Sequence, residues 1–177
     1  MYKNDDDATK ERIKKQEKKY RYITTLLIND YFSGMTNTIQ HTPYWEKVDV
    51  RLTATTDNYT KFTYDIEVKE RNKDIKESPF AELKVAKYER MKKVNKNKRL
   101  LYIVFLNKKE AYIYDLKKLD WAKVEEKLWH IKETQYDDNS EYEDVPTYFI
   151  PIEQAIKIIN VENYYKLYNA NNQSKQE

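Results

Sequence analysis

WEKVDVRLTATTDNYTKFTYDIEVKER (residues 45–71) is the stretch of this chain that decides the fold. Apolar residues at 48, 50, 52 and 54 alternate with polar ones, and the same period of two returns between residues 62 and 71. Such alternation predicts two half-buried β-strands. Residues 56–60 (TDNYT) have the composition of a tight turn, in which Asn58 tolerates a left-handed backbone conformation. We therefore expect a β-hairpin with one apolar and one polar face.

The register of this hairpin follows from keeping its apolar residues on one face, because a slip of one residue would reverse every side chain. The pairs that satisfy this condition are Val48 with Val68, Val50 with Ile66, Leu52 with Tyr64, and Ala54 with Phe62, around a three-residue loop centred on Asn58. On the polar face, Arg51 then lies opposite Asp65 as an ion pair, and Asp49 lies opposite Glu67.

Two facing carboxylates are destabilising across a ladder. Asp49 and Glu67 therefore need a cation between them, or a proton on one of them. Lys69 follows Glu67 at the next position on the same face. Hard divalent cations are held by carboxylate oxygens, and such a cation beside a lysine is suited to hydrolysing a phosphodiester.

Asp49 followed by Glu67-Val68-Lys69 resembles the PD-(D/E)XK motif of the restriction-endonuclease-like nucleases, over residues 45–106. The resemblance implies that Asp49 and Glu67 bind Mg²⁺ (or Mn²⁺), with the Val68 carbonyl as a backbone ligand. It implies that Lys69 positions or activates the attacking water. The proline that the family often has before the aspartate is Val48 here.

A solvated strand face is the alternative interpretation, because charged residues make up 36% of the chain and this spacing can arise by chance. The corresponding alternative function is a non-catalytic module that keeps the nuclease fold and binds nucleic acid or another protein. A pure binding module has no need for two facing carboxylates, which favours a metal-dependent nuclease acting on DNA. Neither the type of cleavage nor the oligomeric state follows from the sequence.

A leading helix is expected over residues 8–32, with an apolar stripe at Ile13, Tyr20, Ile23, Leu27 and Tyr31. Glu17 lies on this stripe. The family resemblance implies that an acidic residue on such a helix can lie near the metal, whereas a surface glutamate is the simpler interpretation. Residues 36–44 are expected to form a loop, in which His41 is a surface residue.

A second helix is expected over residues 78–94, begun by Ser78 as N-cap and Pro79 in the first turn. Lys87 falls within its apolar stripe of Phe80, Leu83, Met91 and Val94, where an apolar residue would be usual. We expect Lys87 to reach the scissile phosphate, the alternative being a lysine that extends to water.

The family resemblance adds further nucleic-acid contacts near this helix. Lys84-x-x-x-Tyr88 has the spacing of the Gln-x-x-x-Tyr pattern found in some members, with lysine in place of glutamine. Lys84 and Tyr88 are therefore expected to bind nucleic acid, together with Arg71 on the face of Glu67. The basic run at residues 92–99 is either a phosphate contact or a solvated turn.

The remaining elements complete an α/β domain with a restriction-endonuclease-like core, in which a mixed central β-sheet is flanked by α-helices. Residues 100–106 predict a central strand buried on both faces, and residues 111–116 a second strand. A helix is expected over residues 118–126, and residues 128–134 form either an extension of that helix or an edge strand. Residues 147–150 are expected to be extended, and a further helix is expected from Pro151. The domain spans residues 8–168, with a flexible tail at 1–7 and a disordered tail at 169–177.

The overall composition is that of a single domain without a disulfide framework, since 177 residues include no cysteine. No apolar run approaches membrane-spanning length, so we expect a cytoplasmic protein of bacterial or phage origin with no membrane partner. The net charge is +3, but residues 137–144 hold five acidic residues and no basic one. The rest of the chain is therefore basic enough to bind a phosphate backbone.

Overall fold

The mixed central sheet flanked by helices that the sequence predicts is confirmed by a computed structural model, which describes residues 7–42, 48–71, 79–94, 98–132 and 142–173. Within these residues a six-stranded sheet has the order β1 (Thr36–His41), β2 (Val50–Thr55), β3 (Lys61–Arg71), β5 (Arg99–Leu106), β6 (Glu110–Asp115) and β9 (Lys157–Asn160). A three-stranded sheet has the order β4 (Phe80–Lys84), β8 (Tyr142–Pro151) and β7 (Glu125–Lys132). β3 and β5 are parallel, and the other paired strands are antiparallel.

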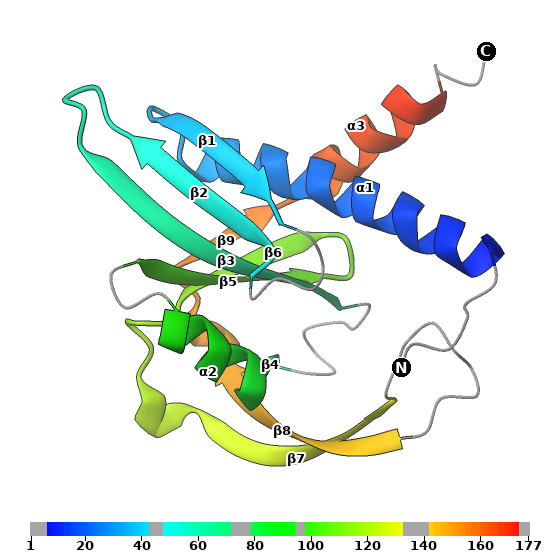
Figure 1. Ribbon diagram of the computed structural model, residues 1–177, viewed down its shortest axis with the longest axis vertical. Helices are drawn as coiled ribbons and strands as arrows, with labels where there is room; N and C mark the ends of the chain where they lie inside the picture. Colours follow the sequence, from blue (N-terminus) through cyan, green and yellow to red (C-terminus); the bar gives the residue numbers. More distant parts are fainter. Residues whose placement is uncertain (1–6, 43–47, 72–78, 95–97, 133–141, 174–177) are drawn as a thin grey trace.

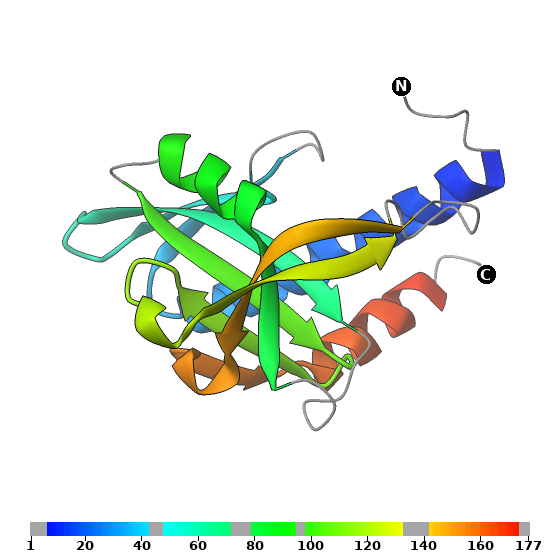
Figure 2. The same cartoon turned by 90° about the horizontal axis from the view of Figure 1, so that it is seen from below.

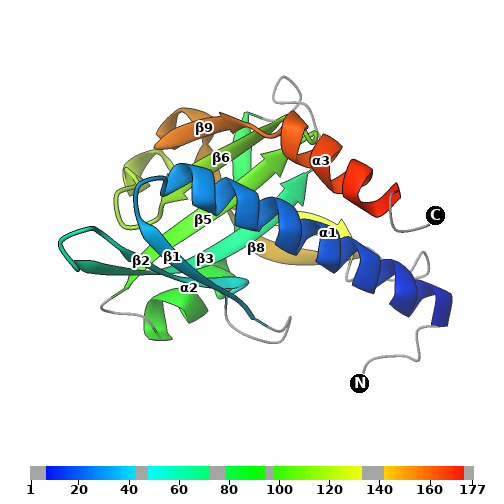
Figure 3. The ribbon, with the colours of Figure 1, turned by 90° about the horizontal axis from the view of Figure 1, so that it is seen from above.

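The two faces of the six-stranded sheet are covered by different elements (Figure 1). The helices α1 (Asp7–Tyr31) and α3 (Glu162–Gln173) pack on one face, as Figure 3 shows from above. The helix α2 (Val85–Val94) and the three-stranded sheet lie on the other side, as Figure 2 shows from below. Each face has its own hydrophobic core, and β5 contributes alternate residues to both. The prediction that residues 100–106 form a central strand buried on both faces is confirmed.

The hairpin of β2 and β3 has the predicted register from Val50 opposite Ile66 to Ala54 opposite Phe62. The predicted pairing of Val48 with Val68 is wrong, because the chain bends at Asp49 and Val48 packs into the core on the α2 side, away from Val50. In the turn, Tyr59 takes the left-handed conformation with a φ of 61°, whereas Asn58, whose residue type tolerates that conformation, does not.

The predicted helix at 78–94 is wrong in its first half, where β4 pairs antiparallel with β8 and α2 begins only at Val85. Ala81, Glu82 and Leu83 are all buried in this strand, so a helical stripe does not describe their packing. The proposed N-cap Ser78 lies outside the described residues, and so do residues 95–97 of the basic run at 92–99. Pairing with a strand more than sixty positions away in the sequence overrides the local helical pattern.

Three further predictions of helix or loop are wrong, because the segments are extended. The loop expected at 36–44 contains β1. The helix expected at 118–126 is a short 3-10 turn (η1, Trp121–Lys123) followed by β7. The helix expected from Pro151 is a second 3-10 turn (η2, Ile152–Gln154) followed by β9. The undecided segment 128–134 belongs to β7 at the edge of its sheet as far as Lys132. α3 continues to Gln173, past the predicted domain boundary at 168.

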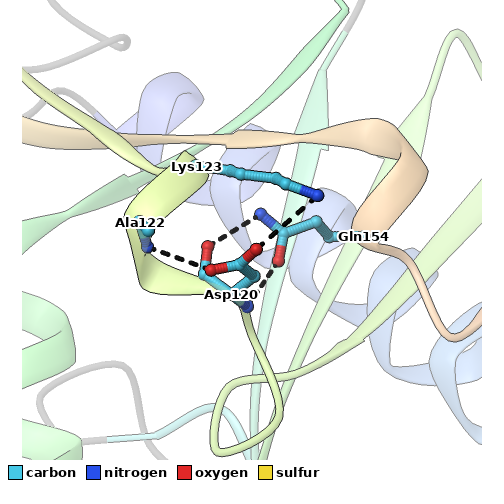
Figure 4. A network of polar contacts seen from close by, with 4 residues as sticks. All are labelled: Asp120, Ala122, Lys123 and Gln154. Carbon is cyan, nitrogen blue, oxygen red and sulfur yellow. Dashed lines mark hydrogen bonds and ion pairs between the residues drawn. The ribbon is translucent and has the colours of Figure 1, made fainter.

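The η1 turn is joined to the η2 turn by hydrogen bonds between the backbone of Asp120 and the side chain of Gln154 (Figure 4). The Asp120 N–H donates to Gln154 Oε1 at 2.7 Å, and Gln154 Nε2 donates to the Asp120 carbonyl at 3.2 Å. Asp120 also caps η1 by accepting from the Ala122 N–H at 3.2 Å. These contacts hold the start of β7 beside the end of β8.

Within the described residues, no helix is long and apolar enough to cross a membrane.

Candidate metal and phosphate site

Asp49 lies at a bend just before β2, and backbone contacts on both sides hold it there. Its N–H donates to the Ile66 carbonyl at 3.0 Å, and its carbonyl accepts from the Thr42 N–H at 2.9 Å. The Thr42 hydroxyl donates to the Val48 carbonyl. The side chain turns across to β3, where Asp49 Oδ2 accepts from the Val68 N–H at 2.8 Å. The Asp49 carboxylate therefore replaces the backbone pairing that the sequence predicted at this position.

Glu67 brings a second carboxylate to the same place from β3. Its side chain is only 13% exposed, and Glu67 Oε2 lies 2.7 Å from Lys87 Nζ on α2. Burial raises the pKa of Glu67 to about 8, with a further increase from the charge of Asp49 and from a hydrogen bond between the two carboxyl groups. Lys87 acts in the opposite direction. The two carboxyl groups thus lie together, as predicted, at a position where a proton or a cation is favourable.

Lys69 follows on the same face of β3 and is half-buried. Burial lowers the pKa of Lys69, the charge of Arg71 lowers it further, and Glu67 partly opposes the change. A lysine whose ammonium form is disfavoured is in the neutral form more often than a surface lysine, and is therefore more available as a general base. The structure brings together Asp49, Glu67, Lys69 and Lys87 from the bend before β2, from β3 and from α2.

Arg71, predicted to contact nucleic acid, is held by Glu82 of β4. Arg71 Nε lies 2.8 Å from Glu82 Oε2, and the Arg71 guanidinium lies 5.2 Å from the centre of the Trp129 ring. Glu82 is almost fully buried, and its carbonyl accepts from the buried Tyr102 hydroxyl at 2.6 Å. Arg71 therefore joins β3 to the three-stranded sheet.

Lys84 and Tyr88 do not have the helical relation that the sequence predicts, because Lys84 ends β4 and only Tyr88 lies on α2. Lys84 is exposed and lies 4.0 Å from the Glu143 carboxylate. Tyr88 is half-buried against Trp121 and Tyr148, with ring centres 4.8 and 5.8 Å away. This packing gives Tyr88 a structural contact in addition to any role at the surface.

Other acidic or imidazole ligands do not join the pair of carboxylates. Among the described residues, no group of three or more Asp, Glu, His and Cys side chains is placed to hold a metal ion, so Glu17 on α1 does not complete one. His41 is half-buried, with a ring nitrogen 2.9 Å from the Thr25 hydroxyl, and is not the surface residue predicted. Asp65 is buried and forms an ion pair with Lys98 at 3.2 Å, although Arg51 faces it in the ladder as predicted.

Two residues that shape the site were not found from the sequence. Glu82 was missed because it lies in a segment whose sequence has a helical pattern. Thr42 was missed because nothing in the sequence marks a hydroxyl group that fixes a bend. A buried acidic residue between two apolar ones at 81–83 was the available signal for Glu82.

No protein-family model matches the chain, and no curated protein matches it in sequence. Among solved structures, the chain is similar to Hjc, a Holliday junction resolvase from the archaeal hyperthermophile Archaeoglobus fulgidus. The similarity has a TM-score of 0.42 and 13% sequence identity, and it covers 79% of this chain and 96% of that chain. A similarity of this size leaves the function to be argued from the geometry of the site.

Proposed function

We propose that this protein is a metal-dependent nuclease that hydrolyses phosphodiester bonds of DNA, with a restriction-endonuclease-like arrangement of its site. The observation that carries the proposal is the contact between the carboxyl group of Glu67 on β3 and that of Asp49, at the bend just before β2. Lys69 lies at the next position on the same face of β3. Paired carboxylates with an adjacent lysine are suited to binding a divalent cation and a phosphate together.

The residues present fit a hard divalent cation. Glu67 Oε2 is buried and makes no hydrogen bond of good geometry with any described residue, although Lys87 Nζ is close by. Asp49 and Glu67 would hold Mg²⁺ or Mn²⁺, with the Val68 carbonyl as a further ligand. When bound, the ion would supply Lewis-acid activation of the phosphate and of a water molecule.

The chain's own residues would then divide the remaining work. The Val68 N–H orients Asp49 through its hydrogen bond to Oδ2. Lys69, with its lowered pKa, orients the attacking water and accepts its proton. Lys87 neutralises the phosphate, for which it must exchange part of its contact with Glu67.

A second candidate function is a module that binds nucleic acid or protein without cleaving it. The observation that favours it is the ion pair of Lys87 with Glu67, because an ammonium group at 2.7 Å can neutralise Glu67 without a metal. The two functions differ in whether a divalent cation competes with Lys87.

A cleavage assay tests the proposed function. Linear, circular, single-stranded and branched DNA are incubated with the wild-type protein and Mn²⁺ or Mg²⁺, with Asp49→Ala and Lys69→Ala beside it. We expect metal-dependent cleavage of at least one DNA by the wild type and none by either variant. The matched control is Lys166→Ala, an exposed lysine on α3 at the opposite face of the six-stranded sheet, which should retain activity. Cleavage that persists in Lys69→Ala would remove Lys69 from the mechanism.

A further inference from the structure

Tyr59 stands at the tip of the β2–β3 hairpin in a conformation that its side chain disfavours. It is 86% exposed and has a φ of 61°. A three-residue hairpin loop of this kind usually has glycine at the left-handed position, since a side chain there is strained. A large aromatic residue that is both strained and exposed points to a function for the side chain.

The turn that carries Tyr59 is well fastened. The Tyr59 N–H donates to the Thr56 carbonyl at 2.9 Å, and the Thr56 N–H donates to the Thr60 carbonyl at 3.0 Å. The Thr60 N–H also donates to the Thr56 hydroxyl at 3.1 Å. The hairpin therefore presents the ring of Tyr59 on an ordered support, which reduces the entropy lost when the ring binds a partner.

The sheet between this tip and the candidate site has a polar face made of cross-strand rows. One row is Thr38, Thr53 and Thr63, and the next towards the tip is Thr36, Thr55 and Lys61. Alternation along β3 places these rows on the same face as Glu67 and Lys69. Four of the six side chains are exposed, and the other two are half-buried.

The charge of this face suits a phosphate backbone. The row nearest the site contains Arg51 and Asp65, and Asp65 is buried and paired with Lys98. Hydroxyl groups and basic side chains are common phosphate contacts. The acidic exception near the tip is Asp57, which is exposed in the turn.

Lys61 and Glu67 are six residue steps apart along β3, which corresponds to about 20 Å, or about six base steps of a duplex. We propose that the polar face of β1, β2 and β3 binds the backbone of a nucleic acid whose scissile phosphate lies at Glu67, and that Tyr59 stacks on an unpaired base at the far end. The position of the phosphate rests on the proposed function. The substrate class is a nucleic acid in which a duplex adjoins unpaired bases, because only such bases offer an open face to a ring.

Binding without cleavage tests this inference. The dissociation constants of a short blunt duplex and of the same duplex with an unpaired bulge are measured by fluorescence anisotropy in EDTA. A 2-aminopurine in the bulge reports stacking through quenching of its fluorescence. We expect the wild type to prefer the bulged DNA, and Tyr59→Leu to weaken binding of that DNA about tenfold with loss of quenching. Tyr59→Phe should keep both.

The matched control is Tyr142→Leu, which removes another exposed tyrosine, on β8. It should bind both DNAs as the wild type does. Unchanged affinity of Tyr59→Leu for the bulged DNA would overturn the inference, and so would equal weakening in the two leucine variants. A change of oligomeric state in Tyr59→Leu would show that the face binds a second copy of the chain and would also overturn it.

The outcome separates this inference from the proposed function, since neither measurement needs catalysis. Stacking that depends on Tyr59 in a protein without cleavage activity would sustain the nucleic-acid surface and remove the nuclease. Cleavage by Tyr59→Leu together with normal DNA binding would sustain the nuclease and remove the role of Tyr59 in the nucleic-acid surface.

Discussion

Glu67 at the candidate site and Glu82 in β4 are both buried carboxylates, but their surroundings differ in kind. Glu82 has a guanidinium partner, Arg71, in a direct hydrogen bond at 2.8 Å. Glu67 has a lysine on one side and the carboxyl group of Asp49 on the other, and burial next to Asp49 raises its pKa to about 8. The negative charge of Glu82 is therefore fully compensated within the protein, whereas that of Glu67 is compensated only in part.

This difference separates a structural ion pair from a functional site. A buried acid with one well-aligned arginine holds two elements together, and removing either partner is costly. Two acids placed together disfavour the metal-free state unless a proton or a cation is added, which is the usual condition of a metal or catalytic site. The same strand, β3, thus carries Arg71, which joins the two sheets, and Glu67, to which we assign the proposed chemistry.

Lys87→Met should lower the cleavage rate about a hundredfold or more, because a charged group that neutralises the transition state is worth several kcal/mol. Its stability should change little, since the uncompensated Glu67 can take up a proton. Cleavage rate and melting temperature are measured on the same preparation. Lys166→Met, an exposed position on α3, is the control and should match the wild type in both. A fully active Lys87→Met protein would leave Lys87 as a counter-ion only.

Glu82→Ala should destabilise the protein by about 3 kcal/mol, because it leaves Arg71 without its carboxylate and opens a cavity between β3 and β4. Urea unfolding measures the change. The control is Glu143→Ala, which removes the acid of an exposed pair with Lys84 and should cost about 0.5 kcal/mol or less. Equal effects of the two substitutions would contradict a structural role for Glu82.

The metal-free protein should lose stability with rising pH in a way that depends on Glu67. The folded-state pKa of about 8 lies above the usual 4.5, so the protonated form is favoured by folding. This contribution is full below pH 4.5 and is lost as the pH rises through 8, with a size of about 5 kcal/mol at most, since each pKa unit corresponds to about 1.4 kcal/mol. Thermal melting in EDTA measures it, and Glu67→Gln should remove this part of the pH dependence. A dependence that is unchanged in Glu67→Gln would place the titrating group elsewhere.

Tyr59→Asn should raise stability by about 0.5 kcal/mol, the smallest change, because asparagine accepts the left-handed conformation more readily than tyrosine. Chemical denaturation measures this, with Asp57→Asn in the same turn as the control. A destabilised Tyr59→Asn protein would show that the tyrosine ring contributes to the fold.

The parts of the fold that could be predicted are those fixed by local pattern. Leu52 and Ile66 lie in strands that alternate strictly and pair across a short turn, so register and face followed from the sequence. Leu83 lies in a strand whose partner is distant, and helix-forming neighbours such as Glu82 favoured the wrong element. The segment of Trp129 stayed undecided between a helix and an edge strand, because its partner strand was not marked in the sequence.

The candidate site was predictable to a similar degree. The contact of Asp49 with Glu67 followed from register, although through a bend and a side-chain hydrogen bond instead of a continuous ladder. The position of Lys87 was suggested by its place in an apolar stripe, whereas its contact with Glu67 depends on where α2 packs. The pairing of Arg71 with Glu82 needs both sheets in place and had no sequence signal of comparable strength.

The measurement that tests the central claim most directly is the melting temperature with and without Mn²⁺, for the wild type and Asp49→Ala. A cation that binds only the folded state stabilises it by about 2.7 kcal/mol at a hundred times its dissociation constant. We predict a clear rise in the melting temperature of the wild type and none in Asp49→Ala. The absence of a rise in the wild type, or an equal rise in both proteins, would contradict a metal site at Asp49 and Glu67.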